Sequence, residues 1–574
     1  MEKRELLAVA RGARPGDLVL RNLRLVDVLA KEIYPTEIVL CGDTIAGIGK
    51  GYRGKHEIDL GGRLVCPGLI DAHVHIESSL VRPREYARAV VARGVTTVIA
   101  NPHEIANVLG LEGVLYMARD GREGPLDILL TVPSSVPATP LSTSGSALKP
   151  ADLVRLRKEG QVVGLGEVMD FPAVVKGDER LLDELALFAD RIIDGHCPGL
   201  DGNDLNAYIA PGIRSDHEST SVDEGREKLR RGMHLFLREG SAARNLQDLL
   251  PLVTSATERW ICFCTDDLNP QDLLNKGSVD HHVRMAIRGG IDPLTAIRMA
   301  TLNAAEYFQL FDRGFIGPGR RADLVVLESL ENFHPAEVYF GGRLVSCSRA
   351  LPDHRVGASA ETEPKRLRAS VKVAVEKLDF SLRVRGNRIR AIHIVPGQLV
   401  TEESICRAKI ENGLALSDPN RDLLKLAVVE RHRGSGRVGL GFVQGLGLHH
   451  GALAGTVAHD HHNLIIAGAD DRSMLTAARA VVEAQGGLAV AQGDEVKCLL
   501  PMPLAGLMSD RTIEEVAAVA ARLKKAAAEL GSPLDDPFMT LSFLGLEVIP
   551  SLKLTDLGLI DVDRMQPVSL FPDE

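Results

Sequence analysis

Short apolar runs recur along the first two-thirds of the chain, and most of them end in a cluster of polar residues. Residues 17–66 alternate apolar and polar positions between glycine-containing turns, a pattern that predicts β-strands rather than helices. A similar pattern returns at residues 314–345, and the phrase GGRLV occurs in both places. We therefore expect these two segments to form one small sheet domain that flanks whatever lies between them.

Between the two strand-rich segments, apolar strands alternate with amphipathic helical stretches over about 250 residues, the length of one barrel domain. The strand candidates are GVTTVIANP, DILLTVPSS, VVGLGEVMD, RIIDGHCPG, a stretch near GIRSDHE, MHLFLREGS and WICFCTDD. This rhythm predicts a (β/α)8 barrel, which holds its chemistry at the carboxyl ends of its strands. The polar residues that end these runs lie where that fold would place its site.

A third region begins after the polar, charged stretch GASAETEPKRLR. It contains the strand-like SLRVRGNRIRAIHIV, a glycine-rich middle and the helical RTIEEVAAVAARLKKAAAELG. These patterns predict a separate α+β domain.

Composition narrows the class of protein. The chain is 45% hydrophobic and 25% charged, which is typical of a soluble globular protein. Its net charge of −10 argues against a nucleic-acid partner. No apolar segment approaches the ~20 residues that span a bilayer, and the N-terminus lacks the apolar core of a signal peptide. Because the eight cysteines show no paired framework, reduced thiols and a cytoplasmic location are expected, without membrane contact.

One stretch near the front, PGLIDAHVHIESS, places two histidines at i and i+2 at the end of an apolar run. Alternate side chains of a strand share a face, so His73 and His75 point together and can bind one metal ion. Other candidate ligands end the later runs: they are Glu167, His196, His217 and Asp266. Nitrogen and oxygen ligands without thiolate suit two ions of zinc, iron or manganese, with Glu167 able to bridge them.

The charges of this ligand set favour hydrolysis. Two divalent cations against Glu167 and Asp266 leave a charge of about +2, which favours hydroxide over water near neutral pH. Asp266, at the end of the last expected strand, can both bind a metal and carry a proton from the attacking water to the leaving group. By contrast, NPHEIANV begins like an H-E-x-x-H zinc helix, but Asn107 stands where the second histidine belongs.

These pieces, together with SDHES, GFIGPGRRADLVVL and VAHDHHNLIIAG, resemble the adenine deaminase family of the amidohydrolase superfamily over nearly the whole chain. The HxH with later His, His and Asp marks the superfamily, whereas NPHEIANV, the glutamate of GLGEVM and HDHHN are specific to this branch. One departure is His461, where the family pattern leads us to expect a smaller residue such as serine.

The resemblance implies a distorted (β/α)8 barrel at residues 67–314, a split β-sandwich from 1–66 and 315–365, and a family-specific C-terminal α+β domain at 366–574. It implies hydrolysis of adenine to hypoxanthine and ammonia by a metal-activated hydroxide, in purine salvage or adenine catabolism. Glu167 stands where many superfamily members use a carboxylated lysine. Two divalent ions, Mn²⁺ or Fe²⁺ ahead of Zn²⁺, and a homo-oligomer of two or more subunits are expected.

Addition of hydroxide at C6 of adenine requires protonation of a ring nitrogen, and the candidate acids are Glu218 and Glu104. Either carboxylate could instead orient a neighbouring histidine. The candidate substrate contacts are Asp267, Phe171, His459 and Asp460, with an ordinary core position as the alternative for Phe171. The HDHHN segment is expected to pack against the mouth of the barrel, within one chain or across a dimer; the alternative is a solvated loop.

Two other functions fit less of the sequence. An amidohydrolase acting on a cyclic amide would usually need the carboxylated lysine where Glu167 stands, while a related 6-aminopurine stays open as substrate. A metal-binding or regulatory protein without catalysis would be expected to lack a ligand or Asp266, and none is missing.

Overall fold

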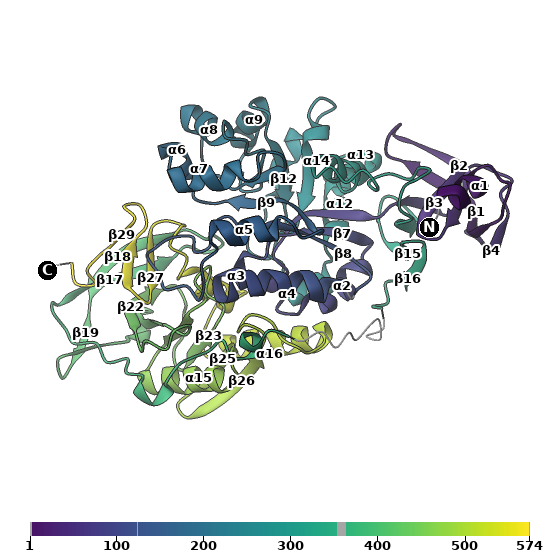
Figure 1. The fold of residues 1–574 in the computed structure, drawn as a ribbon. Helices are drawn as coiled ribbons and strands as arrows, with labels where there is room; N and C mark the ends of the chain where they lie inside the picture. Colours follow the sequence, from purple (N-terminus) through teal and green to yellow (C-terminus); the bar gives the residue numbers. More distant parts are fainter. Residues whose placement is uncertain (1–2, 123, 353–362, 573–574) are drawn as a thin grey trace.

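The computed structural model describes residues 3–122, 124–352 and 363–572. Figure 1 shows an N-terminal sheet at one end of the molecule, a central region of alternating strands and helices, and a C-terminal region packed against the side of the centre.

The central region is a barrel of parallel strands. Its strands are β6 (Leu69–Val74), β7 (Val95–Ala100), β8 (Asp127–Val132), β9 (Val162–Val168), β10 (Ile192–Gly195), β11 (Ser215–Asp216), β12 (His234–Arg238) and β13 (Ile261–Cys264). Hydrogen bonds join β6 to β10 as one sheet and β11 to β13 as another. A parallel bridge between Val74 and Asp266 closes one seam, and Arg214 N donates to Ile193 O, 3.0 Å away, at the other. The predicted (β/α)8 barrel is confirmed.

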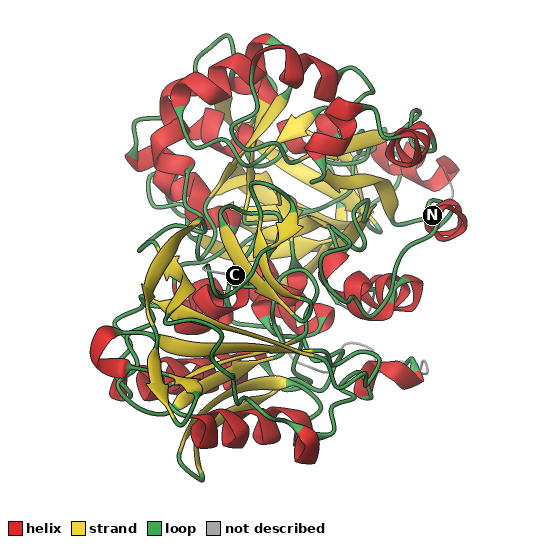
Figure 2. Ribbon diagram, turned by 90° about the vertical axis from the view of Figure 1, so that its left-hand side faces the viewer, coloured by secondary structure: helices red, strands yellow, loops and turns green. Residues whose placement is uncertain are grey.

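Helices surround these strands, as Figure 2 shows in its upper half. They are α2 (Pro83–Val91), α3 (His103–Leu109), α4 (Leu111–Gly121), α5 (Pro150–Leu156), α6 (Phe171–Lys176), α7 (Glu179–Ala186), α8 (Gly202–Ile209), α9 (Val222–Arg230), α10 (Leu246–Leu249), α11 (Pro270–Asn275), α12 (Val279–Arg288), α13 (Pro293–Met299) and α14 (Leu302–Tyr307). Because helices cover the outside, strands such as β7 are buried along their whole length. This burial explains why the sequences of these strands are continuous apolar runs.

The N-terminal sheet combines two distant parts of the chain. Its strands are β1 (Gly16–Asp27), β2 (Glu32–Cys41), β3 (Thr44–Ile48), β4 (Gly54–Asp59) and β5 (Leu64–Pro67), followed by β14 (Leu324–Leu327), β15 (Pro335–Phe340) and β16 (Arg343–Cys347). Strand β14 pairs antiparallel with β5 and so joins the two parts. The prediction that both strand-rich segments share one sheet is confirmed, and a short helix α1 (Lys3–Ala10), which the sequence pattern did not predict, packs beside β2 and β3.

The C-terminal region is built on an eight-stranded sheet in the order β18-β17-β22-β21-β24-β23-β25-β26. These strands are β17 (Arg388–Ile394), β18 (Thr401–Arg407), β21 (Leu424–Val429), β22 (Val438–Gln444), β23 (Ala452–Gly455), β24 (Leu464–Gly468), β25 (Gly487–Gln492) and β26 (Glu495–Pro501). Smaller sheets contain β19 (Lys409–Glu411), β20 (Leu414–Leu416), β27 (Leu552–Thr555), β28 (Gly558–Asp561) and β29 (Gln566–Pro567). The helices are α15 (Asp471–Glu483), α16 (Ile513–Glu529) and α17 (Pro537–Phe543).

Helix α16 is the one predicted from RTIEEVAAVAARLKKAAAELG. It begins at a capping box in which Thr512 and Glu515 each bond the other's backbone N–H. The C-terminal region is thus α+β, as expected.

Polar contacts hold the C-terminal region on the barrel. Two hydroxyl groups in the loop after β8 donate hydrogen bonds to carboxylates of the C-terminal region: Thr143 Oγ1 lies 2.6 Å from Asp556 Oδ2, and Ser142 Oγ lies 2.6 Å from Glu547 Oε1. On this arrangement we propose domains at 1–66 with 315–365, at 67–314 and at 366–574. The expected linker GASAETEPKRLR lies partly outside the described residues. Within the described ranges, no helix has the length and apolar character needed to cross a membrane.

Candidate metal centre and active-site cavity

The first two histidines converge at the mouth of the barrel. His73 is the penultimate residue of strand β6 and His75 directly follows the strand, and their Nε2 atoms lie 3.1 Å apart. His75 Nε2 is 3.1 Å from Asp266 Oδ1 and 3.3 Å from Glu167 Oε1. His73 Nε2 lies 3.6 and 3.7 Å from the same two oxygens. These four side chains form a first ligand group.

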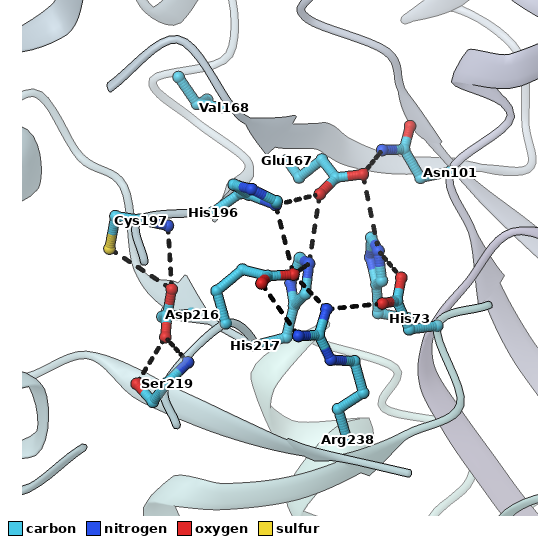
Figure 3. Close-up of polar contacts among 12 residues, drawn as sticks. His73, Asn101, Glu167, Val168, His196, Cys197, Asp216, His217, Ser219 and Arg238 are labelled. Atoms are coloured by element: carbon cyan, nitrogen blue, oxygen red, sulfur yellow. Dashed lines mark hydrogen bonds and ion pairs between the residues drawn. The ribbon is translucent and has the colours of Figure 1, made fainter. Parts of the chain in front are cut away.

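A second ligand group lies on the other side of Glu167. Its Oε2 atom is 2.9 Å from His196 Nδ1 and 3.2 Å from His217 Nε2. Figure 3 shows Glu167 between His196 and His217 on one side and His73 on the other. One carboxylate oxygen therefore faces each group, which is the arrangement of a bridging ligand.

The spacing of these atoms fits bound cations. Two ligand atoms at ~2.1 Å from a tetrahedral metal lie about 3.4 Å apart, close to the separations in both groups. His73, His75, Glu167 and His217 are buried, so the donor atoms are withdrawn from bulk water. The donor set, imidazole nitrogen with carboxylate oxygen, suits divalent first-row metals.

Backbone and amide groups orient the ligands. His75 Nδ1 donates to Asn101 O at 2.9 Å, which leaves its Nε2 free for a metal. Asn101 Nδ2 donates to Glu167 Oε1 at 3.0 Å. Burial alone would raise the pKa of Glu167, but hydrogen bonds from His103, His196 and other imidazoles hold it well below its usual range. Glu167 is therefore anionic.

A buried ion pair lies beside the second ligand group and holds the segments that carry it. Lys228 Nζ lies 2.9 Å from Asp216 Oδ2, and both side chains are fully buried. Asp216 also accepts from Cys197 N at 3.0 Å and from Ser219 N at 2.9 Å (Figure 3). These bonds fix the segments that follow β10 and β11, which carry His196 and His217.

Arg238, at the end of β12, was missed by the sequence reasoning. Its guanidinium donates to Asp266 Oδ2 at 2.8 Å and pairs with both carboxylate oxygens of Glu218, at 2.9 Å for Oε2. Although burial raises the pKa of each carboxyl, Arg238 holds the pKa of Glu218 and of Asp266 below the usual values. A sequence signal for Arg238 existed, because it is a polar residue at the end of a predicted strand, as the candidate metal ligands are.

A third His–Glu cluster joins the barrel to the C-terminal domain. Glu104, on α3, lies 2.5 Å from His459 Nδ1 through Oε1 and contacts His462 Nε2 through Oε2. His103 links this cluster to the metal centre, since its Nε2 is 3.2 Å from Glu104 Oε1 and its Nδ1 is 3.3 Å from Glu167 Oε1. Its sequence signal was its position three residues after the end of β7.

A cavity of about 580 Å³, which includes space open to solvent, lies over the ligand groups. On its barrel side are ligands of both groups together with Glu104, Glu218, Arg238 and Asp267. The C-terminal domain supplies the opposite wall, which consists of Leu399, His459, Asp460, Phe543, Leu546 and Ile549. The HDHHN segment thus packs at the barrel mouth within one chain and is buried rather than solvated.

The structure does not bring Phe171 to this cavity. Phe171 begins α6 and is half-buried against the edge of the main hydrophobic core, which is closer to the alternative of a core position than to a substrate contact. The aromatic residue in the cavity wall is Phe543, whose ring stacks on His459 with centroids 4.7 Å apart. Phe543 lies more than 250 residues from the ligand strands in the sequence, and its apolar neighbours give it no distinguishing pattern.

A parallel barrel with two His-rich ligand groups at its carboxyl end, joined by a carboxylate, defines a metal-dependent hydrolase of the amidohydrolase class. The Amidohydrolase family model matches residues 64–345, and the Adenine deaminase C-terminal domain model matches residues 398–566. By these matches and by its full-length relatives, the chain belongs to the adenine deaminase family.

Curated relatives named adenine deaminase match this chain over nearly its whole length. The one from Desulfatibacillum aliphaticivorans is 48% identical and covers 99% of both chains. One from Cereibacter sphaeroides is 46% identical and covers 98% of both chains. Among solved structures, a β-aspartyl dipeptidase from Fervidobacterium islandicum matches at a TM-score of 0.46 with 17% identity, covering 59% of this chain and 99% of the other.

Proposed function

We propose that this protein hydrolyses adenine to hypoxanthine and ammonia. The observation that carries the proposal is Glu167, whose two oxygens face two separate groups of imidazole ligands beneath the cavity. The full-length relatives named adenine deaminase support adenine as the substrate. Glu167 occupies the bridging position directly, so a carboxylated lysine, as expected of a cyclic-amide hydrolase, has no place here.

We propose that the centre holds two divalent ions, Mn²⁺ or Fe²⁺, with Zn²⁺ also compatible with the ligands. His73, His75 and Asp266 would hold one ion, His196 and His217 the other, and Glu167 both. Such ions lower the pKa of water toward about 7, so that hydroxide is available near neutral pH.

Asp266 is suited to move protons between water and the departing amine. Its Oδ1 lies 3.1 Å from His75 Nε2, and Arg238 holds its Oδ2 at 2.8 Å. This bond fixes the carboxylate beside the cavity and keeps it anionic until it accepts the remaining proton of the water-derived hydroxyl after that hydroxyl has added to the purine. Delivery of that proton to the amine produces ammonia.

The purine would lie between the ligand groups and the C-terminal wall. Phe543, Leu546 and Ile549 offer an apolar surface for its face. Asp267, His459 and Asp460 are the polar groups available to its edges, and Asp267 is oriented by a hydrogen bond from Ser78. A homo-oligomer and a cytoplasmic location stay predictions.

The test is ammonia release from a panel of substrates by protein loaded separately with Mn²⁺, Fe²⁺ and Zn²⁺. The panel contains adenine, other 6-aminopurines, a dihydropyrimidine and a hydantoin, with cyclic-amide opening followed by absorbance. We expect adenine to be turned over with the highest kcat/KM. If adenine is inert with all three metals, the proposed function is wrong.

A further inference from the structure

The proposed reaction needs an acid, and the carboxylates predicted for that task are already engaged. Both oxygens of Glu218 are bound by the Arg238 guanidinium, with Nη2 to Oε2 at 2.9 Å. Both oxygens of Glu104 accept from imidazoles of the C-terminal domain. Each carboxylate therefore accepts hydrogen bonds from a cationic or polar partner, and neither presents a proton to the cavity.

His459 presents an open nitrogen instead. Its Nδ1 donates to Glu104 Oε1 at 2.5 Å, and its ring is held flat against Phe543 with an angle of 22° between the planes. The other ring nitrogen, Nε2, is buried and has no hydrogen-bond partner among the described residues. Since His459 lines the same cavity as Asp266, a bound ligand is the partner that this nitrogen lacks.

We propose that His459, supplied by the C-terminal domain, is the general acid that protonates a ring nitrogen of adenine, and that Glu104 is the residue that positions it. This inference rests on the proposed function. It assigns the carboxyl-terminal domain a direct part in the chemistry and makes His459 a catalytic residue rather than only a substrate contact.

The charged surroundings of His459 favour its protonated form. Burial alone would lower the pKa of His459, but Glu104 on α3, Asp267 after β13 and Asp460 on its own segment together raise it to about 9. His462, also beside Glu104, has a lowered pKa and so competes little as a second cation. From α17 the ring meets Phe543, which is uncharged.

The protons balance over one turnover. As hydroxide adds to C6, the His459 Nε2–H bond breaks and an N–H bond forms on the purine ring. The hydroxyl proton of the addition product passes through Asp266 to the amino group, the C6–N bond breaks, and ammonia leaves with C6=O formed. The proton released when the next water becomes hydroxide returns to His459, so water and adenine give hypoxanthine and ammonia without another reactant.

The test replaces His459→Gln in the full-length, metal-loaded protein and compares it with His461→Ser, a change in the same segment away from the cavity wall. We expect kcat of H459Q to fall by about 10²–10⁴-fold, the contribution of a general acid, with metal content and the KM for adenine within threefold of wild type. The fall of kcat at alkaline pH, where the acid loses its proton, should disappear. H461S should keep the wild-type profile.

A second variant, Glu104→Gln, keeps the inference falsifiable where H459Q does not fold. Without the anionic partner, His459 loses its proton more readily, so the alkaline limb of kcat should move to lower pH while both metals are retained. If either variant keeps the wild-type kcat and alkaline limb, the acid assignment is wrong. Wild-type protein that is inert on adenine refutes the proposed function itself, so the two failures are distinguishable.

Discussion

Two His–Glu assemblies lie next to each other in this molecule and differ in their spacing. Around Glu167, carboxylate oxygens and imidazole nitrogens are 2.9 to 3.7 Å apart, and the two oxygens face different histidines: Oε1 faces His73, His75 and His103, and Oε2 faces His196 and His217. Around Glu104, the separation from the C-terminal histidines is shorter, 2.5 Å to His459 with a direct contact to His462, while His103 lies 3.2 Å away. The first spacing leaves room for cations between the ligand atoms, whereas the second is that of hydrogen bonds.

The comparison teaches that residue type and proximity alone do not distinguish a candidate metal site from a hydrogen-bonded cluster. The ligand-type atoms of Glu104, His459 and His462 also lie within 4.8 Å of one another. What separates the assemblies is how they are built. The Glu167 groups come from strand ends of one barrel, whereas Glu104 is a barrel residue held by two histidines of another domain.

Of the variants that test this difference between the Glu167 and Glu104 assemblies, Glu167→Gln should have the largest effect on metal content and kcat. An amide bridges two cations poorly, so we expect loss of bound metal and a fall in kcat of about a thousandfold or more. Glu104→Gln is the matched control, because it removes the same charge from the hydrogen-bonded assembly and should keep both metals. Elemental analysis with ammonia assays measures both; loss of metal from E104Q would show that its cluster is a metal site after all.

A smaller effect, on the KM for adenine, is expected when the cavity wall formed by the C-terminal domain is changed. Phe543→Ala removes an aromatic surface from the purine face and should raise the KM for adenine by about tenfold, which corresponds to ~1.4 kcal/mol. Phe171→Ala, an aromatic deletion outside the cavity, should change KM by less than about twofold. Steady-state kinetics of the two variants at equal metal content decide this, and equal effects would contradict the assigned wall.

The smallest effect is a pH dependence of stability that belongs to the Glu104 assembly. The pKa of His459 is raised from 6.5 to about 9 in the folded protein. A raised pKa contributes stability below pH ~6.5 that is lost as the pH rises through the folded value. Between pH 6.5 and 9.5, the Tm of wild type should therefore fall by about 2 °C more than that of H459Q. Parallel curves from calorimetry would show that the pair adds no pH-linked stability.

The barrel was predictable because each strand carries its own signal. Apolar runs such as GVTTVIANP identify buried strands, and the polar residue that ends a run identifies the site edge. Applied to every run, that rule also indicates His103 and Arg238. It fails for Phe171, which follows a strand end but packs half-buried against the core, since the first residue of a helix can face either way.

The sequence alone determined the parallel barrel and the split N-terminal sheet, and it predicted the six candidate metal ligands, because each depends on local periodicity and on strand ends that meet at one edge. Only the tertiary structure decided which partners the remaining polar groups take. Arg238 between Asp266 and Glu218, and His459 between Glu104 and Phe543, are contacts between distant segments. Such contacts depend on how the domains pack, and no periodicity within one segment encodes them.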